Sequence, residues 1–101
     1  KVVLSDGTVV WLNAGSTLKY SNKFNTANRR VELNGEGYFE VTKKAGATFI
    51  VQTHGYDVVV KGTKFDVSAY DDDPFISTTL LEGSVELNYK GSQIGCLLES
   101  P

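Results

Sequence analysis

Hydrophobic and polar positions alternate along most of this chain, which is the pattern of half-buried β-strands. Val, Ile, Thr, Tyr and Phe lie in short runs that Gly, Asn, Asp and Ser separate, as in strands joined by turns. No window of about eleven residues has the apolar spacing of an amphipathic helix. The pattern predicts strands at residues 1–4, 9–12, 17–20, 30–33, 37–41, 49–53, 56–61, 64–70, 76–81, 84–89 and 94–98.

The region from position 30 to position 41 keeps one alternation throughout. Apolar residues such as Val31 and Phe39 occupy odd positions, and charged residues occupy most of the even ones. Gly35 and Gly37 interrupt the β-branched and aromatic residues, so a bulge or a sharp bend is expected there.

These runs predict an all-β fold of about nine or ten short, mostly antiparallel strands, with almost no helix. Such a series is typical of a sandwich, a barrel or a short layered β-coil. Strands and helices do not alternate, which excludes a parallel sheet with crossover helices. The chain has 101 residues, of which 41% are hydrophobic and 22% charged, so residues 1–101 are expected to form one globular domain.

Charge argues against nucleic acid as a partner. Ten basic and twelve acidic residues are interspersed and give a net charge of −2, whereas nucleic-acid affinity depends on clustered phosphate contacts. Arg29 and Arg30 are interpreted as a solvated flank of the strand that follows. There is no apolar run of transmembrane length and no signal peptide in the sequence, and the chain is expected to be an excised piece of a longer protein.

Metal and cofactor sites are not expected. His54 is the single histidine and Cys96 the single cysteine, so no internal disulfide can form and the ligand set of a zinc site is missing. His54 beside Gly55 is interpreted as a turn residue. The Asp71–Asp72–Asp73 run could offer oxygen ligands to calcium, but it lacks EF-hand spacing and is interpreted as a solvated loop that ends at Pro74.

The sequence also argues against an enzyme. Glu36 and Glu40 share a predicted strand face, as do Glu82 and Glu86, and such carboxylate pairs could cleave a glycoside if held at the right separation. They are interpreted instead as solvated surface, because their neighbours on that face are polar. The sequence contains no nucleophile elbow and no glycine-rich phosphate loop.

Aromatic residues give the one sign of binding. Tyr and Trp combine an apolar body with a polar group and are enriched at interfaces, although each also suits a strand. A line of them on one face would favour a carbohydrate-binding β-sandwich module, which is the alternative function. The residues concerned are Trp11, Tyr20, Tyr38, Tyr56, Tyr70 and Tyr89.

Five segments resemble, in order, the motifs of the FecR-type sensor domain of anti-sigma regulators. They cover most of the chain from about residue 2 to residue 90, while the tail at 96–101 matches only loosely. Each motif alone is weak, but all five in sequence are specific. The segments are LSDGTVVWLNAGS at 4–16, RRVELNGEGYFEV at 29–41, FIVQT at 49–53, VKGTKFDV at 60–67 and TLLEGSVEL at 79–87.

The resemblance implies a periplasmic signal-relay domain of a single-pass inner-membrane protein in a Gram-negative bacterium. Such a domain receives a signal from the signalling domain of a TonB-dependent outer-membrane receptor. The signal passes inward to an extracytoplasmic-function sigma factor through a cytoplasmic segment that this chain lacks. The resemblance implies no cofactor, and it does not identify the binding surface.

The motif residues themselves are interpreted as structural. The glycines are expected at bends and the apolar residues in the core, so that they specify the fold and not a reactive site. This set comprises Asp6, Gly7, Leu12, Asn13, Gly15, Gly37, Phe39, Val41, Gly62, Thr63, Phe65, Val67, Gly83 and Val85.

Overall fold

The computed structural model of this chain describes residues 1–21, 24, 29–43, 47–70, 72, 76–89 and 95–99. Within them it contains ten strands and no helix. None of the described residues therefore forms a helix that could span a membrane. The strands are β1 (Val2–Val3), β2 (Val9–Leu12), β3 (Thr17–Tyr20), β4 (Arg30–Glu40), β5 (Phe49–Gln52), β6 (Tyr56–Val60), β7 (Lys64–Ala69), β8 (Ser77–Glu82), β9 (Ser84–Tyr89) and β10 (Gly95–Glu99).

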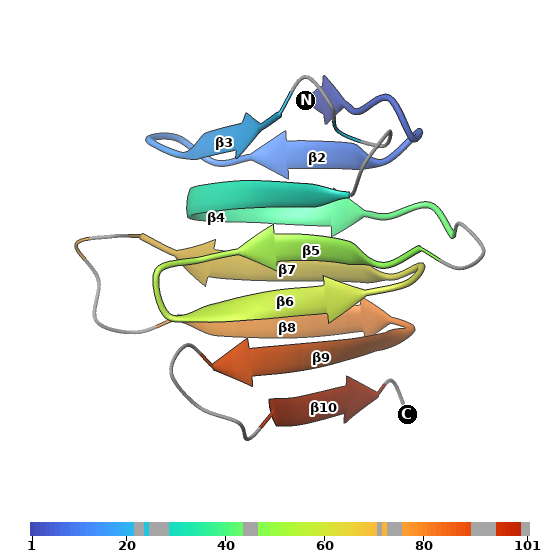
Figure 1. The fold of residues 1–101 in the computed structure, drawn as a ribbon. Helices are drawn as coiled ribbons and strands as arrows, with labels where there is room; N and C mark the ends of the chain where they lie inside the picture. Colours follow the sequence, from blue (N-terminus) through green and yellow to red (C-terminus); the bar gives the residue numbers. More distant parts are fainter. Residues whose placement is uncertain are drawn as a thin grey trace.

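The strands form two layers that share β4 (Figure 1). One layer, called sheet A, has the order β1-β2-β4-β7-β8, and all of its pairs are antiparallel. The other layer, sheet B, has the order β3-β4-β5-β6-β9-β10. Its β4–β5 pair is parallel and the rest are antiparallel. The fold is therefore a β-sandwich with one strand common to both sheets.

Strand β4 passes from sheet B to sheet A at its centre. Residues 31–34 pair with β3, whereas residues 35–40 pair with β7. The transition falls at Gly35, which has a φ of 117° that a side chain would strain. The backbone turns there while the inside–outside alternation continues, so Val31 and Phe39 both face the core.

The core lies between the two sheets. Phe39 and Phe65 of sheet A stack with their ring centroids 5.0 Å apart, and Phe49 of sheet B meets Phe39 edge-on at 6.3 Å. All three rings are fully buried, and side chains of this kind stabilise a fold by roughly 1.5–3 kcal/mol each. Phe24, which follows β3, is also buried and meets Phe49. The buried apolar set is Leu4, Val10, Phe24, Val31, Leu33, Phe39, Val41, Phe49, Val51, Tyr56, Val58, Val60, Phe65, Val67, Ala69, Val85 and Leu87.

The all-β prediction is confirmed, and most predicted strands agree with the structure within one residue at each end. One division was wrong, because the segments predicted at 30–33 and 37–41 belong to a single strand, β4. The strand turns at Gly35 without losing its pairing, since β2, β3 and β7 hydrogen-bond to it in turn, and Gly37 is regularly paired. The last strand, whose pairing the sequence left open, lies antiparallel to β9.

Candidate functional site

A buried ion pair joins the first turn to the start of β4. Nη1 of Arg29 lies 3.0 Å from Oδ2 of Asp6, and only 2% and 1% of these two side chains are exposed. Asp6 also accepts hydrogen bonds from the backbone N–H and the hydroxyl of Thr8, at 2.9 and 2.8 Å. These bonds satisfy the carboxylate inside the protein, which a buried charge requires.

The guanidinium of Arg29 also binds backbone from three other segments. It donates to the carbonyl oxygens of Thr42 and Ala47 at 2.8 Å and to that of Lys61 at 3.4 Å. It lies 5.7 Å from the ring centroid of Phe49, and its Nε has no hydrogen-bond partner among the described residues. The prediction that Arg29 lies on a solvated face was therefore wrong, whereas its neighbour Arg30 is exposed.

A second polar cluster holds the bend of β4. Ser16 Oγ accepts the N–H of Glu36 at 2.9 Å, and the N–H of Asn13 donates to the Glu36 carbonyl at 3.0 Å. The Asn13 side-chain amide donates to the Glu36 carboxylate. A Cβ on Gly35 would collide with Ser16, so the close approach of these segments requires glycine. The first two motifs thus meet at the point where the chain changes sheets.

The fourth and fifth motifs also meet. The hydroxyl of Thr63 donates to the Ser84 carbonyl at 3.0 Å, and a Cβ on Gly83 would lie 3.0 Å from the Gly62 carbonyl oxygen. Gly83 has a φ of 99°, so the connection from β8 to β9 depends on its lack of a side chain. The N–H of Val41 donates to the Thr63 carbonyl at 2.9 Å, which ties this corner to β4.

The remaining residues of the structural set divide between core and surface turns. Phe39, Phe65, Val67 and Val85 are fully buried, and Val41 nearly so. Leu12 packs partly buried against the core. Gly7 and Gly15 have positive φ in turns, whereas Gly37 lies inside β4 opposite Leu12 and Val67.

The outer face of sheet A carries an aromatic pair beside two carboxyl groups. Trp11 of β2 lies opposite Tyr38 of β4, with ring centroids 5.4 Å apart. Tyr38 in turn lies opposite Asp66 of β7, whose carboxyl hydrogen-bonds to that of Glu36. Burial, followed by the hydrogen bond and charge of Glu36, raises the pKa of Asp66 to about 6. Asp66 therefore keeps its proton to a higher pH than an exposed aspartate does.

On the same face, the acidic side chains near the start of β7 are paired with a lysine. Lys64 of β7 lies 3.8 Å from a carboxylate oxygen of Glu40 and 3.5 Å from one of Glu82. Burial raises the pKa of the Tyr38 hydroxyl, and the neighbouring Glu40 acts in the same direction. Glu36 and Glu40 share a face as predicted, yet they have different partners. Glu82 and Glu86 do not share a face: they lie on β8 and β9, which belong to different sheets.

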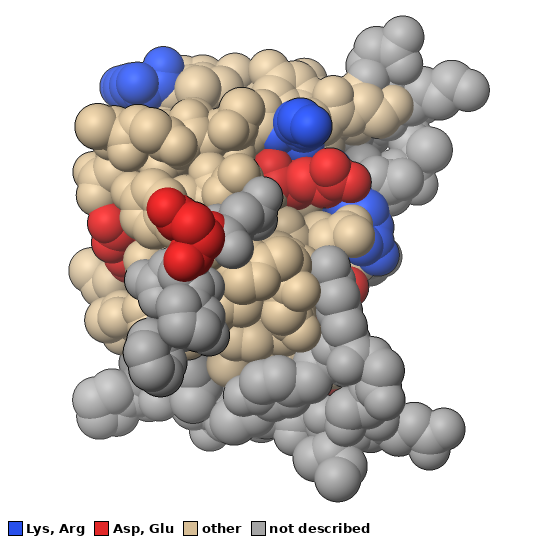
Figure 2. Space-filling view, turned by 90° about the vertical axis from the view of Figure 1, so that its left-hand side faces the viewer, with Lys and Arg blue, Asp and Glu red and all other residues tan. Residues whose placement is uncertain are grey.

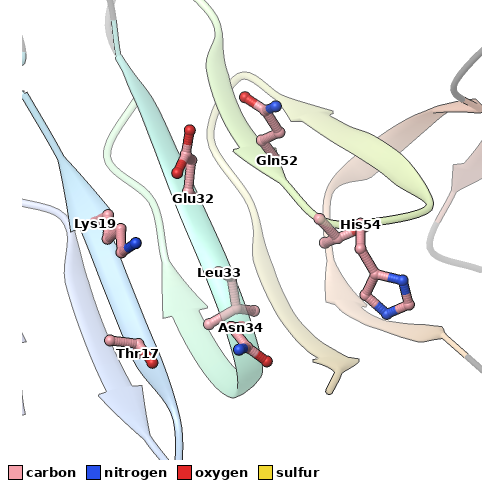
Figure 3. A pocket seen from close by; sticks show the side chains of 8 residues that line it. Thr17, Lys19, Glu32, Leu33, Asn34, Gln52 and His54 are labelled. Carbon is pink, nitrogen blue, oxygen red and sulfur yellow. The ribbon is translucent and has the colours of Figure 1, made fainter. Parts of the chain in front are cut away.

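A polar hollow of about 280 Å³ opens on the outer face of sheet B, between β3, β4 and β5 (Figure 3). It forms because the parallel pairing of β4 and β5 stops at Glu32 and Gln52, after which the two strands separate. Lys19 of β3 lies opposite Glu32, and the His54 ring points away from both towards the Tyr70 carbonyl, 3.1 Å from its Nε2. The hollow offers amide, ammonium and carboxylate groups of mixed charge and no nucleophile–base pair.

The other sequence candidates do not form a site together. His54 is exposed and lines the rim of the hollow, and the side chain of Cys96 lies outside the described residues. Of the Asp71–Pro74 loop, only Asp72 is described. The described residues contain no group of three or more His, Cys, Asp or Glu side chains that could hold a metal ion. On the face drawn in Figure 2, the described acidic and basic side chains form small separate groups among uncharged residues.

The comparisons with known families and with solved structures point to the same protein family. The family model described as FecR protein matches residues 1–86. Two crystal structures of a "putative anti-sigma factor" from Parabacteroides distasonis ATCC 8503, at 1.65 and 2.50 Å resolution, are each 40% identical, with a TM-score of 0.88. Each match covers 97% of this chain and 45% of the other, so this chain spans less than half the length of those chains. No curated protein matches it. From the family match and the shared fold together, the chain belongs to the FecR family.

Proposed function

We propose that this chain is the periplasmic signal-relay domain of a membrane-anchored anti-sigma regulator in a Gram-negative bacterium. In this role it binds the signalling domain of a TonB-dependent outer-membrane receptor. The signal then acts on an extracytoplasmic-function sigma factor through a cytoplasmic segment elsewhere in the same protein. The observation that carries the proposal is the FecR match over residues 1–86, supported by the 40% identity to the "putative anti-sigma factor".

The side chains described support a binding role over a catalytic one. The motif residues build turns and core, through contacts such as Asp6 with Arg29 and Ser16 with Glu36. Asp66, whose carboxyl pKa is raised, lies on an open sheet face. An open face suits a protein partner better than a small substrate, which is usually bound in a concave pocket.

The alternative, a carbohydrate-binding module, predicted a line of exposed aromatic rings on one face. Among the described side chains, the exposed Trp and Tyr are Trp11 at 38% and Tyr20 at 51%. They lie on different sheets, because β2 belongs to sheet A and β3 to sheet B. Tyr56 is buried and Tyr38 is half-buried, so this arrangement does not favour a glycan platform.

The test is a calorimetric titration of the whole periplasmic region of the regulator with the signalling domain of its receptor. We expect saturable binding with a dissociation constant in the micromolar range, as for transient signalling contacts. The signalling domain of an unrelated receptor is the control. If two folded partners show no heat of binding at high-micromolar concentration, the proposal is wrong.

A cell-based measurement complements the titration. Deleting residues 1–101 from the full-length regulator should uncouple a reporter driven by the sigma factor from the receptor's cargo. If the reporter responds to cargo as before, this domain does not relay the signal. A glycan array probed with the chain separates the alternative, because specific glycan binding without receptor binding would favour the carbohydrate module.

A further inference from the structure

The carboxyls of Glu36 and Asp66 form an acid pair that no described Lys or Arg compensates. The described ion pairs of sheet A's outer face all involve Lys64, whose partners are Glu40 and Glu82. Glu36 and Asp66 lie diagonally on β4 and β7, since Glu36 pairs with Ser68 and Asp66 with Tyr38. Burial, and after it the hydrogen bond and the charge of Glu36, raises the pKa of Asp66 and disfavours its charged form.

This acid pair is held in a fixed position. The backbone N–H of Glu36 is bound by Ser16 Oγ, and its carboxylate accepts the side-chain amide of Asn13. Asp66 lies in the middle of β7, which pairs with β4 on one side and β8 on the other. A ligand that bonds to both carboxyls would therefore find them already oriented, which lowers the entropic cost of binding.

Aromatic rings flank the acid pair. Trp11, Tyr38 and Asp66 form one row across β2, β4 and β7. The ammonium of Lys1 lies 5.7 Å from the centroid of the Trp11 ring. This cation–π contact within the chain shows that a cation can bind at the ring. Val3 is 63% exposed and lies opposite Val9 at the margin of the same face.

We propose that the outer face of sheet A is a docking surface for an arginine-bearing segment of a protein partner, with the guanidinium bound by Glu36 and Asp66 beside the Trp11 and Tyr38 rings. The proposal rests on the proposed function only for the identity of that partner. Charge complementarity selects the occupant: the acids of this face are Glu36, Glu40, Asp66 and Glu82, whereas its cations are Lys64 and Lys1, with Lys43 at the edge beside Glu40 and Glu82.

Arginine fits this surface better than lysine or a sugar. A guanidinium is planar, binds carboxylates through two parallel hydrogen bonds and stacks on aromatic rings, whereas an ammonium is a compact point charge. The planes of Trp11 and Tyr38 are inclined at 35° to each other, so the two rings do not form one flat platform for a sugar ring. A cation would also remove the repulsion within the acid pair.

The first experiment is an NMR titration of the chain with the blocked tripeptide acetyl-Gly-Arg-Gly-amide at pH 7 and low salt. We expect shifts confined to the Trp11 indole N–H and to the amides of Gly35, Gly37 and Ser68. The same peptide with citrulline, which keeps the shape and loses the charge, should give none. Equal shifts with citrulline, or shifts confined to sheet B, would overturn the proposal.

Substitutions test the same contact in the partner complex. Glu36→Gln and Asp66→Asn should each weaken binding of the receptor's signalling domain by about tenfold, the loss of one charge-assisted hydrogen bond. Glu86→Gln makes the same change on an exposed residue of sheet B and should leave binding unchanged. Tight binding to all three variants would refute the docking surface and leave the proposed function intact.

Two further outcomes separate the hypotheses. If the signalling domain does not bind the unmodified chain, the proposed function fails, and the arginine peptide alone decides whether the surface binds guanidinium. If neutral oligosaccharides shift the Trp11 and Ser68 signals while the arginine peptide does not, the occupant is a glycan and the proposal is wrong.

Discussion

Asp6, in the turn between β1 and β2, and Asp66, inside β7, differ in burial and in the charge of their partner. The Asp6 side chain is 1% exposed and has an arginine 3.0 Å away. Asp66 is half-buried and has another carboxyl, that of Glu36, as its hydrogen-bond partner. Complete burial of a charge requires a counter-charge, whereas partial burial permits a repulsive pair that solvent screens.

This difference separates a structural centre from a binding surface. The Asp6–Arg29 pair uses its hydrogen-bonding capacity internally, on Thr8, Thr42 and Ala47. The Glu36–Asp66 pair keeps unfavourable charge at the surface, where an external cation can relieve it. Substitutions at the two centres should therefore differ in size and in sign.

The largest effect is expected from Arg29→Met. Methionine keeps much of the side-chain length but leaves the buried Asp6 without its cation, so the free energy of unfolding should fall by about 3–5 kcal/mol. Arg30→Met is the matched control, because Arg30 is exposed and should change stability by less than about 0.5 kcal/mol. Urea unfolding measures both. Equal losses in the two variants would show that Asp6–Arg29 is no structural centre.

Gly35→Ala should have the second-largest effect. The backbone φ of 117° is strained for alanine, and the new Cβ would lie 2.6 Å from Cβ of Ser16, forcing the bend of β4 to open. We expect a loss of more than about 2 kcal/mol in thermal or urea unfolding. Gly15→Ala is the control, since its φ of 75° carries a backbone cost while nothing lies within 4 Å of the added Cβ. A smaller loss at Gly35 than at Gly15 would contradict the close contact with Ser16.

The raised pKa of the half-buried Asp66 should make stability fall as pH rises from about 4 to about 6. The folded protein keeps the proton of Asp66 up to a pKa of about 6, whereas the unfolded chain loses it near 3.8. In that window the folded state binds more protons, so its stabilisation is present at low pH and is lost on the way up. Screening by solvent reduces the expected change to about 1 kcal/mol.

The measurement compares urea unfolding of the unmodified chain and of Asp66→Asn at several pH values. Asparagine removes the titrating group, so the difference between the two free energies isolates Asp66 from the other carboxyls. We expect the variant to gain relative stability between pH 4 and pH 6 and to keep that gain above pH 6. Parallel curves would show that the pKa of Asp66 is not raised in the folded protein.

The smallest effect belongs to Lys64→Gln. Lys64 is 49% exposed and its two carboxylate partners lie 3.5 and 3.8 Å away on the surface. Its removal should lower stability by less than about 0.5 kcal/mol, and added salt should remove the difference. A loss above 1 kcal/mol that salt does not change would place Lys64 with Arg29 as a structural cation.

The strands of this fold were predictable because alternation depends on local sequence. Gly83 and the run from Ser84 to Tyr89 mark a turn and a strand by residue type alone, and both lie where expected. The parallel contact between Arg30 and Ile50 was not predictable, since nothing local specifies which strand pairs with β4. Local patterns give the elements, and only the packed chain gives their order in a sheet.

The candidate site was predictable to a smaller extent. Arg29 was misplaced because arginine is rarely buried, yet its position has the same parity as Val31 and Leu33, which is a signal of the inner face. The contact between Glu36 and Asp66 had no sequence signal, because it depends on the register of β4 against β7. Trp11 and Tyr38 were candidates for binding, but their contact follows from the pairing of β2 with β4.

Because β4 contributes hydrogen bonds to both layers, neither layer can slide over the other without breaking the backbone ladder of that strand. A force applied to sheet A is therefore carried into sheet B along a covalent path and not through the softer contacts between side chains. In hydrogen-exchange experiments, the amides of Arg30–Glu40 should therefore exchange together, because the strand opens in one cooperative step.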